Sequence, residues 1–84
     1  MDIETKKNLL KLFGSNLQKL RKKKMLSYRE LAQLCDVDHS QISKIEKGLI
    51  SIQITTIYEL ANGLNVQAKE LLNFEVRSDK DNCG

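Results

Sequence analysis

The stretch SYRELAQLCDVDHSQISKIEKG, residues 27–48, holds two short amphipathic segments separated by a few polar residues. Ser27 stands three residues before Glu30, which is the spacing of a capping box and marks the start of a helix. A helix is therefore expected over residues 28–35. The next apolar residues recur at a helical interval, so a further helix is expected over residues 39–47.

These two helices meet the positional requirements of a helix-turn-helix. Ala32 supplies the small residue where the helices cross, and Asp36 stands where the turn needs a residue that tolerates positive φ. We expect Asp38 to cap the second helix and Gly48 to end it in a left-handed conformation. Apolar residues occupy the inner positions of both helices: Leu31, Cys35, Val37, Ile42 and Ile45. A generic helical hairpin would not need this spacing, so the pattern favours a helix-turn-helix.

Helical periodicity continues on both sides of this pair. Before it, a helix is expected over residues 8–24, from these apolar positions: Leu9, Leu10, Leu12, Phe13, Leu17 and Leu20. Gly14 lies inside that helix, where Gly costs about 1 kcal/mol relative to Ala, so we expect it to permit a close helix contact. After the pair, a fourth helix is expected from Ile54 to near Gly63 and a short fifth helix from about residue 67. The sequence therefore predicts an all-α fold of five helices around one core.

The length of the chain bounds what it can do. With 84 residues, it is expected to form one domain, residues 1–76, followed by a disordered polar tail, residues 77–84. Neither a membrane span nor a signal peptide is expected, because no apolar run exceeds two residues. Two cysteines do not make a disulfide scaffold, so we expect a cytoplasmic protein, with Cys35 in the core and Cys83 in the tail. The sequence shows neither a metal-ligand cluster nor a catalytic pair, so we expect no enzymatic activity, cofactor, metal or small-molecule substrate.

Positive charge is concentrated in the first third of the chain. The formal net charge is +3, and the densest cluster runs from Lys19 to Lys24. Such a cluster predicts a polyanionic partner such as nucleic acid. The alternative is a solvated helix end, because Lys and Arg near a helix C-terminus complement its dipole.

A family resemblance covers nearly the whole chain. The matching segments are Leu17-x-x-Leu20-Arg21, Leu26-Ser27-x-x-Glu30-Leu31-Ala32, Val37-Asp38-x-x-x-Ile42-Ser43-Lys44-Ile45-Glu46-Lys47-Gly48 and Ile57-x-x-Leu60-Ala61-x-x-Leu64. On these segments the chain resembles the Xre family, the helix-turn-helix domains similar to lambda repressor and Cro. The resemblance implies a five-helix DNA-binding domain of the lambda-repressor type, with the helix over 39–47 in the major groove. The chain departs from the usual family pattern at Tyr28, Asp36 and His39.

The resemblance also implies which residues contact DNA. By this resemblance, His39, Ser40 and Lys44 stand at the base-reading positions of the third helix, and Gln41 and Ser43 lie close enough to be included with them. Phosphate-binding residues are expected at helix ends and in the connector: Arg21, Lys23, Lys24, Ser27, Tyr28, Lys47 and Ser51. Alternatives stay open, because Lys44 and Lys47 are also consistent with solvated surface and Gln41 with packing or a phosphate contact. In the family, the positions of Arg21 and Glu46 commonly form an ion pair, and we expect it here; the alternative is two unrelated surface charges.

These features together predict a sequence-specific regulator that binds double-stranded DNA. One recognition helix reads only a few base pairs, so we expect a homodimer, acting as a repressor or a controller protein on a palindromic operator. Its interface is expected among apolar residues outside the motif: Leu49, Ile50, Ile52, Leu64, Val66 and Phe74. The expected location is the nucleoid of a bacterial or phage-infected cell, with RNA polymerase or a toxin as further partners. The alternative function is a protein-interaction module, such as an antitoxin whose main partner is a protein.

Overall fold

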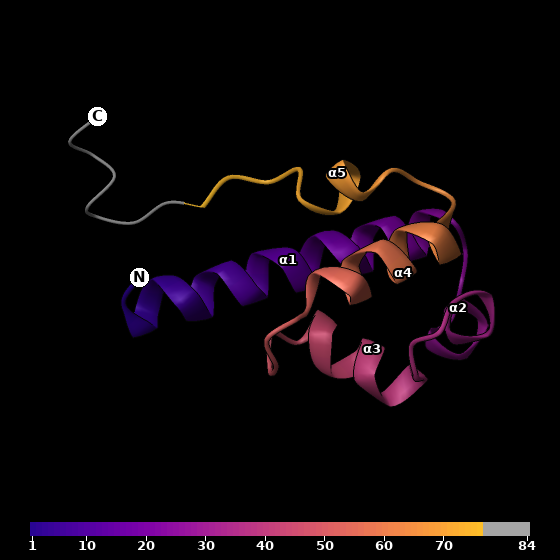
Figure 1. Cartoon of the computed structure of the whole chain (residues 1–84), viewed down its shortest axis with the longest axis horizontal. Coiled ribbons are helices and arrows are strands. Elements are labelled where there is room, and N and C mark those ends of the chain that lie inside the picture. The colour runs from indigo at the N-terminus through magenta and orange to yellow at the C-terminus, as the bar shows by residue number, and fades with distance from the viewer. Residues whose placement is uncertain (77–84) are drawn as a thin grey trace.

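A computed structural model describes residues 1–76 of the chain, and this part contains helices and no strand. In chain order the helices are α1 (Ile3–Lys23), α2 (Tyr28–Leu34), α3 (His39–Glu46), α4 (Ile54–Leu64) and α5 (Ala68–Leu71) (Figure 1). The expected all-α fold of five helices is confirmed. The tail expected over residues 77–84, with Cys83, lies outside the described residues.

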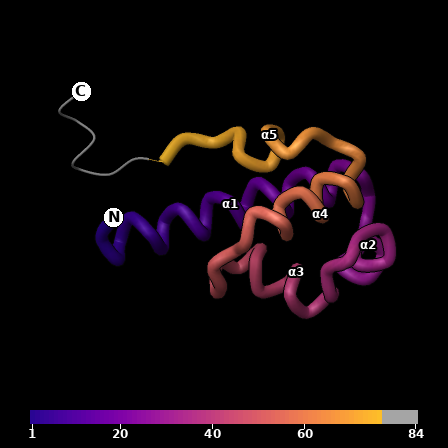
Figure 2. The backbone as a smooth tube through the Cα atoms, viewed as in Figure 1, coloured from indigo at the N-terminus to yellow at the C-terminus, as the bar shows by residue number. Residues whose placement is uncertain are grey.

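The long helix α1 organises the other elements. It packs against α3 and also against α5, while α2 packs against α3 and α4. Figures 1 and 2 show α2 and α3 on one side of α1 and α4, with α5 and the segment after it on the other side. The helix-turn-helix therefore faces away from the C-terminal part of the domain.

One apolar core joins the helices. Every helix contributes at least one buried side chain to it, and the residues of this core are Phe13, Leu17, Leu31, Val37, Ile42, Ile45, Leu60, Ala61, Leu64 and Leu71. Ile42 and Ile45, expected on the inner face of α3, are both in this cluster. Their burial fixes the opposite face of α3 toward solvent.

The first helix begins five residues earlier than residue 8, where we expected its start. Asp2 is the reason, because its Oδ1 accepts a hydrogen bond of 2.8 Å from the Thr5 backbone amide and so caps the helix. The apolar pattern over residues 8–24 did not reveal this start, because the first turn of α1 is exposed. At the other end, the chain reverses at Met25, whose φ is 59°.

Close backbone contacts hold α1 to its neighbours. A Cβ built on Gly14 would lie 2.5 Å from the Glu46 carbonyl oxygen, so only glycine lets α1 approach the end of α3 this closely. The close contact expected at Gly14 is confirmed. Farther along α1, the Asn16 side-chain amide donates to the carbonyl oxygens of Glu70 and Leu71 at 2.8 and 2.9 Å. These bonds tie α5 to α1.

The conformation of the turn between α2 and α3 differs from the one we predicted for Asp36. Asp36 does not adopt a positive φ; among the described non-glycine residues only Met25 and Asn65 do. The chain instead extends at Cys35, with φ −148° and ψ 175°, and the Asp36 amide donates to Glu59 Oε1 at 3.1 Å. A carboxylate from α4 therefore holds the turn, and no left-handed residue is needed. Gly48 ends α3 with a φ of 72°, as expected.

Candidate nucleic-acid interface

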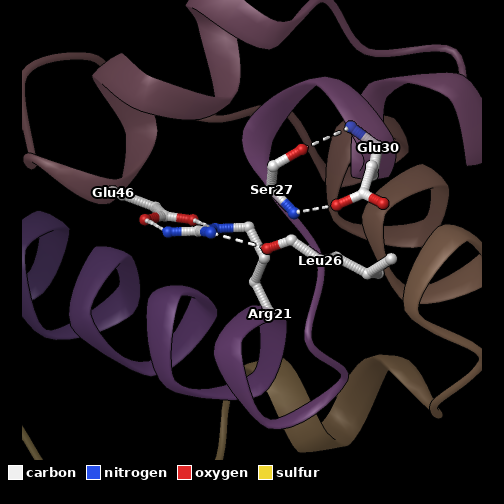
Figure 3. A network of polar contacts seen from close by, with 5 residues as sticks. All are labelled: Arg21, Leu26, Ser27, Glu30 and Glu46. Carbon is white, nitrogen blue, oxygen red and sulfur yellow. Dashed lines mark hydrogen bonds and ion pairs between the residues drawn. The ribbon is translucent and has the colours of Figure 1, made fainter.

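Arg21 and Glu46 form a buried ion pair between α1 and the end of α3 (Figure 3). Arg21 Nε donates to Glu46 Oε2 at 2.7 Å, and a second guanidinium nitrogen donates to Oε1 at 3.0 Å. The third nitrogen donates to the Leu26 carbonyl oxygen at 2.7 Å. The expected pair is thus present in a two-pronged geometry, which is the strong form of an Arg–carboxylate contact. It joins α1, the segment before α2, and α3.

The same contacts remove Arg21 from the phosphate-binding set. Only 7% of the residue is exposed, and each of its three guanidinium nitrogens already donates a hydrogen bond. The Tyr28 ring lies 4.3 Å from the guanidinium carbon, which places a cation–π contact on one face of the group. Hydrogen bonding to Glu46 raises the pKa of Arg21 above its ordinary value. The expectation that Arg21 also contacts phosphate is therefore corrected, because the guanidinium is buried and each of its nitrogens is already bonded within the protein.

The start of α2 is closed by its own side chains. Ser27 Oγ accepts from the Glu30 amide at 3.1 Å, and Glu30 Oε1 accepts from the Ser27 amide at 2.8 Å (Figure 3). This is the capping box expected from the sequence. The hydrogen bonds from Ser27 lower the pKa of the Glu30 carboxyl.

The start of α3 is built differently, and it corrects a second prediction. Asp38 is the N-cap residue, but its side chain makes no hydrogen bond to a backbone amide. Its Oδ2 instead accepts a bond of 2.8 Å from the Ser40 hydroxyl, and Oδ1 lies 3.6 Å from His39 Nδ1. The bond from the Ser40 hydroxyl is the main cause that lowers the pKa of Asp38, and the nearby backbone amides of Ser40 and Gln41 lower it further.

The residues expected to read bases share the solvent-facing side of α3. Ser40, Gln41 and Lys44 are exposed, while His39 and Ser43 are half-buried. Two of them, His39 and Gln41, line an open groove between α2 and α3. Arg29 and Gln33 of α2 line this groove as well, and our sequence reasoning did not name them. Their four-residue spacing on the polar face of α2 is the signal that was available.

The other residues expected to contact phosphate lie at exposed helix ends. Lys23 and Lys24 end α1, Lys47 follows α3, and Ser51 precedes α4; all four are exposed. Ser27 is exposed, whereas Tyr28 is half-buried against Arg21. Among the described residues, the structure therefore leaves lysine ammonium groups and the exposed Arg29 guanidinium of α2, not the Arg21 guanidinium, as the accessible positive charges near the helix-turn-helix.

The apolar residues expected at a dimer interface are placed unequally. Leu49 is 66% exposed, whereas Leu64 is 1% exposed and belongs to the core, so it is removed from the interface set. Four others are half-buried and pack against the core: Ile50, Ile52, Val66 and Phe74. Phe74 makes an edge contact with Phe13, with ring centres 6.3 Å apart. Several exposed apolar residues were not named for the interface, among them Ile54, Tyr58 and Leu72. Helical periodicity alone could not identify these exposed residues, because it shows which residues share a helix face but not whether another helix covers that face.

We also examined residues 1–76 for metal-binding clusters, reactive cysteines and membrane-spanning helices. Within residues 1–76, the structure brings no three potential metal-ligating side chains together. Cys35 is half-buried with its thiol donating to the Leu31 carbonyl oxygen at 3.3 Å, and burial raises its pKa. In the same part of the chain, no helix has both the length and the apolar character needed to cross a bilayer.

Comparison with known proteins agrees with this geometry. A family model described as "Helix-turn-helix" matches residues 17–71, which is most of the chain. The control protein C.BamHI from Bacillus amyloliquefaciens is 35% identical over 68 residues, covering 80% of this chain and 84% of that protein.

Solved structures share the fold. The crystal structure of the restriction-modification controller protein C.AhdI from Aeromonas hydrophila superposes with a TM-score of 0.72 at 35% identity, covering 74% of this chain and 94% of that one. The clp gene regulator ClgR from C. glutamicum has the same fold, with a TM-score of 0.71 at 23% identity over 76% of this chain and 83% of that one. The arrangement of α2 and α3, the matching family model and these relatives lead to one conclusion: the chain belongs to the helix-turn-helix family of DNA-binding transcription regulators, which are not enzymes.

Proposed function

We propose that this protein is a homodimeric repressor or controller protein that places α3 in the major groove of a palindromic operator. The observation that carries the proposal is the first half of α3, where polar side chains face solvent while Ile42 and Ile45 are buried. The similarity to two controller proteins supports the controller type. The residues proposed to read bases are His39, Ser40, Gln41, Ser43 and Lys44.

Phosphate contacts would set the position of α3 in the groove without reading sequence. The residues proposed for this role lie around the motif: Lys23, Lys24, Ser27, Tyr28, Lys47 and Ser51. Their lysines are exposed, so they can approach the DNA backbone without losing an internal partner. Arg29 of α2 joins this set, because it lines the groove beside α3.

We propose a dimer because one recognition helix contacts too few base pairs to select a single DNA site. A good base contact discriminates by about 1–3 kcal/mol, and two half-sites one helical turn apart double the number of such contacts. The proposed interface comprises Leu49, Ile50, Ile52, Val66 and Phe74, with Ile54 and Leu72 added by their exposure. Replacing Leu49 and Val66 with Lys should give a monomer with weaker operator binding; unchanged mass in solution would contradict this interface.

We also place the protein in the cytoplasm on nucleoid DNA, and RNA polymerase is a further partner if the regulator also activates. Glu59 is a poor candidate for that contact, because its carboxylate accepts the Asp36 amide within the fold.

The test is a selection from random duplex DNA, repeated at higher salt, with the bound pool sequenced. An enriched palindrome would support a dimeric operator-binding regulator. Salt-sensitive binding without an enriched motif would reflect phosphate attraction alone. That result would contradict the proposal and favour the alternative of an antitoxin-like module that binds a protein.

A further inference from the structure

Ser40 presents an unusual hydrogen-bonding state at the start of α3. A serine hydroxyl has one hydrogen to donate and two lone pairs that accept, so in general it contacts any base. Here its oxygen lies 2.8 Å from Asp38 Oδ2, and an ionised carboxylate only accepts. The single hydrogen of Ser40 therefore points to Asp38. The two lone pairs of the Ser40 oxygen therefore remain free to accept a hydrogen bond from a partner outside the protein.

The neighbourhood of Asp38 favours this arrangement. No capping hydrogen bond joins the carboxylate to a backbone amide, and its shortest polar contact is the 2.8 Å bond from the Ser40 hydroxyl. That bond is also the main reason for the lowered pKa of Asp38, to which the nearby Ser40 and Gln41 amides contribute less. His39 Nδ1 lies 3.6 Å from the other carboxylate oxygen, so both oxygens of Asp38 face side chains of the first turn of α3. A hydrogen bond to a charged acceptor is about twice as strong as a neutral one, which favours keeping it when DNA approaches.

The major-groove edges of the bases differ in what they offer to an acceptor. Adenine and cytosine carry exocyclic amines that donate, whereas guanine and thymine carry carbonyl oxygens that accept. A hydroxyl that only accepts can bond the first two and is repelled by the second two. The expected preference therefore separates A and C from G and T on one strand, and it differs from a purine–pyrimidine or an A·T–G·C preference.

We propose that Asp38 is a specificity-determining positioning residue, which orients Ser40 as an acceptor and so selects a base with an exocyclic amine at one position of each half-site. The inference rests on the proposed function, since it requires α3 to lie in the major groove. It assigns to Asp38 a role in base selection rather than in helix capping.

The experiment uses the full chain and begins from the motif enriched by the random-duplex selection. Comparing the pools selected by the wild-type protein and by Ser40→Ala identifies the base pair that Ser40 contacts. Four duplexes that differ only at this base pair then give dissociation constants by fluorescence anisotropy. For the wild-type protein, A and C on one strand should bind about tenfold more tightly than G and T.

Asp38→Ala should reduce that difference to about twofold or less, because the freed hydroxyl can then donate as well as accept. The matched control is Asp36→Ala, which removes the same charge at a position two residues before Asp38. Asp36 is exposed like Asp38, but its side chain makes no bond to Ser40. This control should change all four affinities together and keep their ratio. The double variant Asp38→Ala/Ser40→Ala should show no further loss of preference beyond Ser40→Ala, because the two residues act as one unit.

The inference is overturned if G or T binds as tightly as A and C, or if Asp38→Ala keeps the wild-type ratio. In either case an enriched motif would leave the proposed function standing. A selection that enriches no motif would overturn the proposed function, and this inference with it. Ser40→Ala changes an exposed side chain, so its pool remains informative even if Asp38→Ala lowers stability.

Discussion

The two helices of the helix-turn-helix begin in different ways. At the start of α2, Ser27 and Glu30 bond each other's backbone amides, so the side chains of this turn are used within it. At the start of α3, the Asp38 carboxylate bonds another side chain, and the polar residues that follow face solvent. The difference separates two tasks within one motif. The start of α2 contributes to stability, whereas the start of α3 leaves polar side chains facing solvent, as the proposed function requires.

The largest expected effect on stability comes from removing Arg21, whose side chain connects the start of α2 to the end of α3. Arg21 bonds Glu46 at the end of α3 and the carbonyl of Leu26, the residue before Ser27. Arg21→Ala should lower the free energy of unfolding by about 3–5 kcal/mol, because the Glu46 carboxylate would stay buried without its partner. Urea denaturation followed by circular dichroism measures this loss.

A paired replacement is the control for this variant. Arg21→Met together with Glu46→Leu should recover most of the lost stability, because it removes the uncompensated charge. A loss below about 1 kcal/mol for Arg21→Ala is the magnitude of an exposed pair and would contradict a linking role for this contact.

The next largest expected effect is on DNA binding, and it tests the proposed role of the exposed face of α3. Lys44→Ala on α3 should weaken operator binding by about 1–3 kcal/mol and relax the preference at one base pair. Its matched control is Lys23→Ala, at the end of α1. That change should weaken binding equally on all sequences and reduce the salt slope by about 1. Titrations of operator and unrelated duplexes at several salt concentrations distinguish the two. Equal losses on both duplexes for Lys44→Ala would count against base reading by this residue.

A smaller effect tests the comparison itself. Ser27→Ala should cost about 1 kcal/mol of stability, because it removes an N-cap that accepts a backbone amide. Asp38→Ala removes no capping bond of this geometry and should cost less than Ser27→Ala, because only the favourable charge of a carboxylate near the helix N-terminus is lost. Thermal or urea unfolding of both variants gives the two values. Equal losses would show that the starts of α2 and α3 contribute to stability alike.

The smallest effect is the pH dependence of the capping box. The pKa of Glu30 is lowered in the folded protein relative to its ordinary value of 4.5, so its ionised form contributes stability above pH 4.5. That contribution should disappear as the pH falls through the lower pKa of the folded state. Glu30→Gln keeps the capping geometry without the titrating group and should flatten this part of the stability profile. Denaturation midpoints between pH 7 and 3 provide the measurement; identical profiles for both proteins would contradict the role of Glu30.

Sequence reasoning identified the features that depend on local spacing. The capping box, the stop at Gly48 and the inner face of α3 all follow from residues a few positions apart, and the structure contains all three. The Arg21–Glu46 pair was found through the family resemblance, because its partners are 25 positions apart.

The errors have a common cause, which is competition from groups distant in sequence or from a neighbouring side chain. Asp36 needs no left-handed conformation, because Glu59 from α4 binds its amide. Asp38 stands at the N-cap of α3, but its side chain bonds the Ser40 hydroxyl and makes no capping hydrogen bond. Arg21 and Leu64 are buried by tertiary packing, so their assignment to a ligand or partner surface failed. The assignments of the remaining interface residues stay predictions.

The approach of α1 to α3 at Gly14 has a consequence for how this regulator can change its target. The end of α3 rests on a backbone surface, and its inner side chains are committed to the core. The orientation of α3 therefore does not depend on the residues at positions 40, 41 and 44, all of which are exposed. Those positions can be exchanged for the corresponding residues of another regulator without rebuilding the scaffold. Under the proposed function, retargeting to a new DNA site requires only a few substitutions at these surface positions, while Gly14 must stay unchanged.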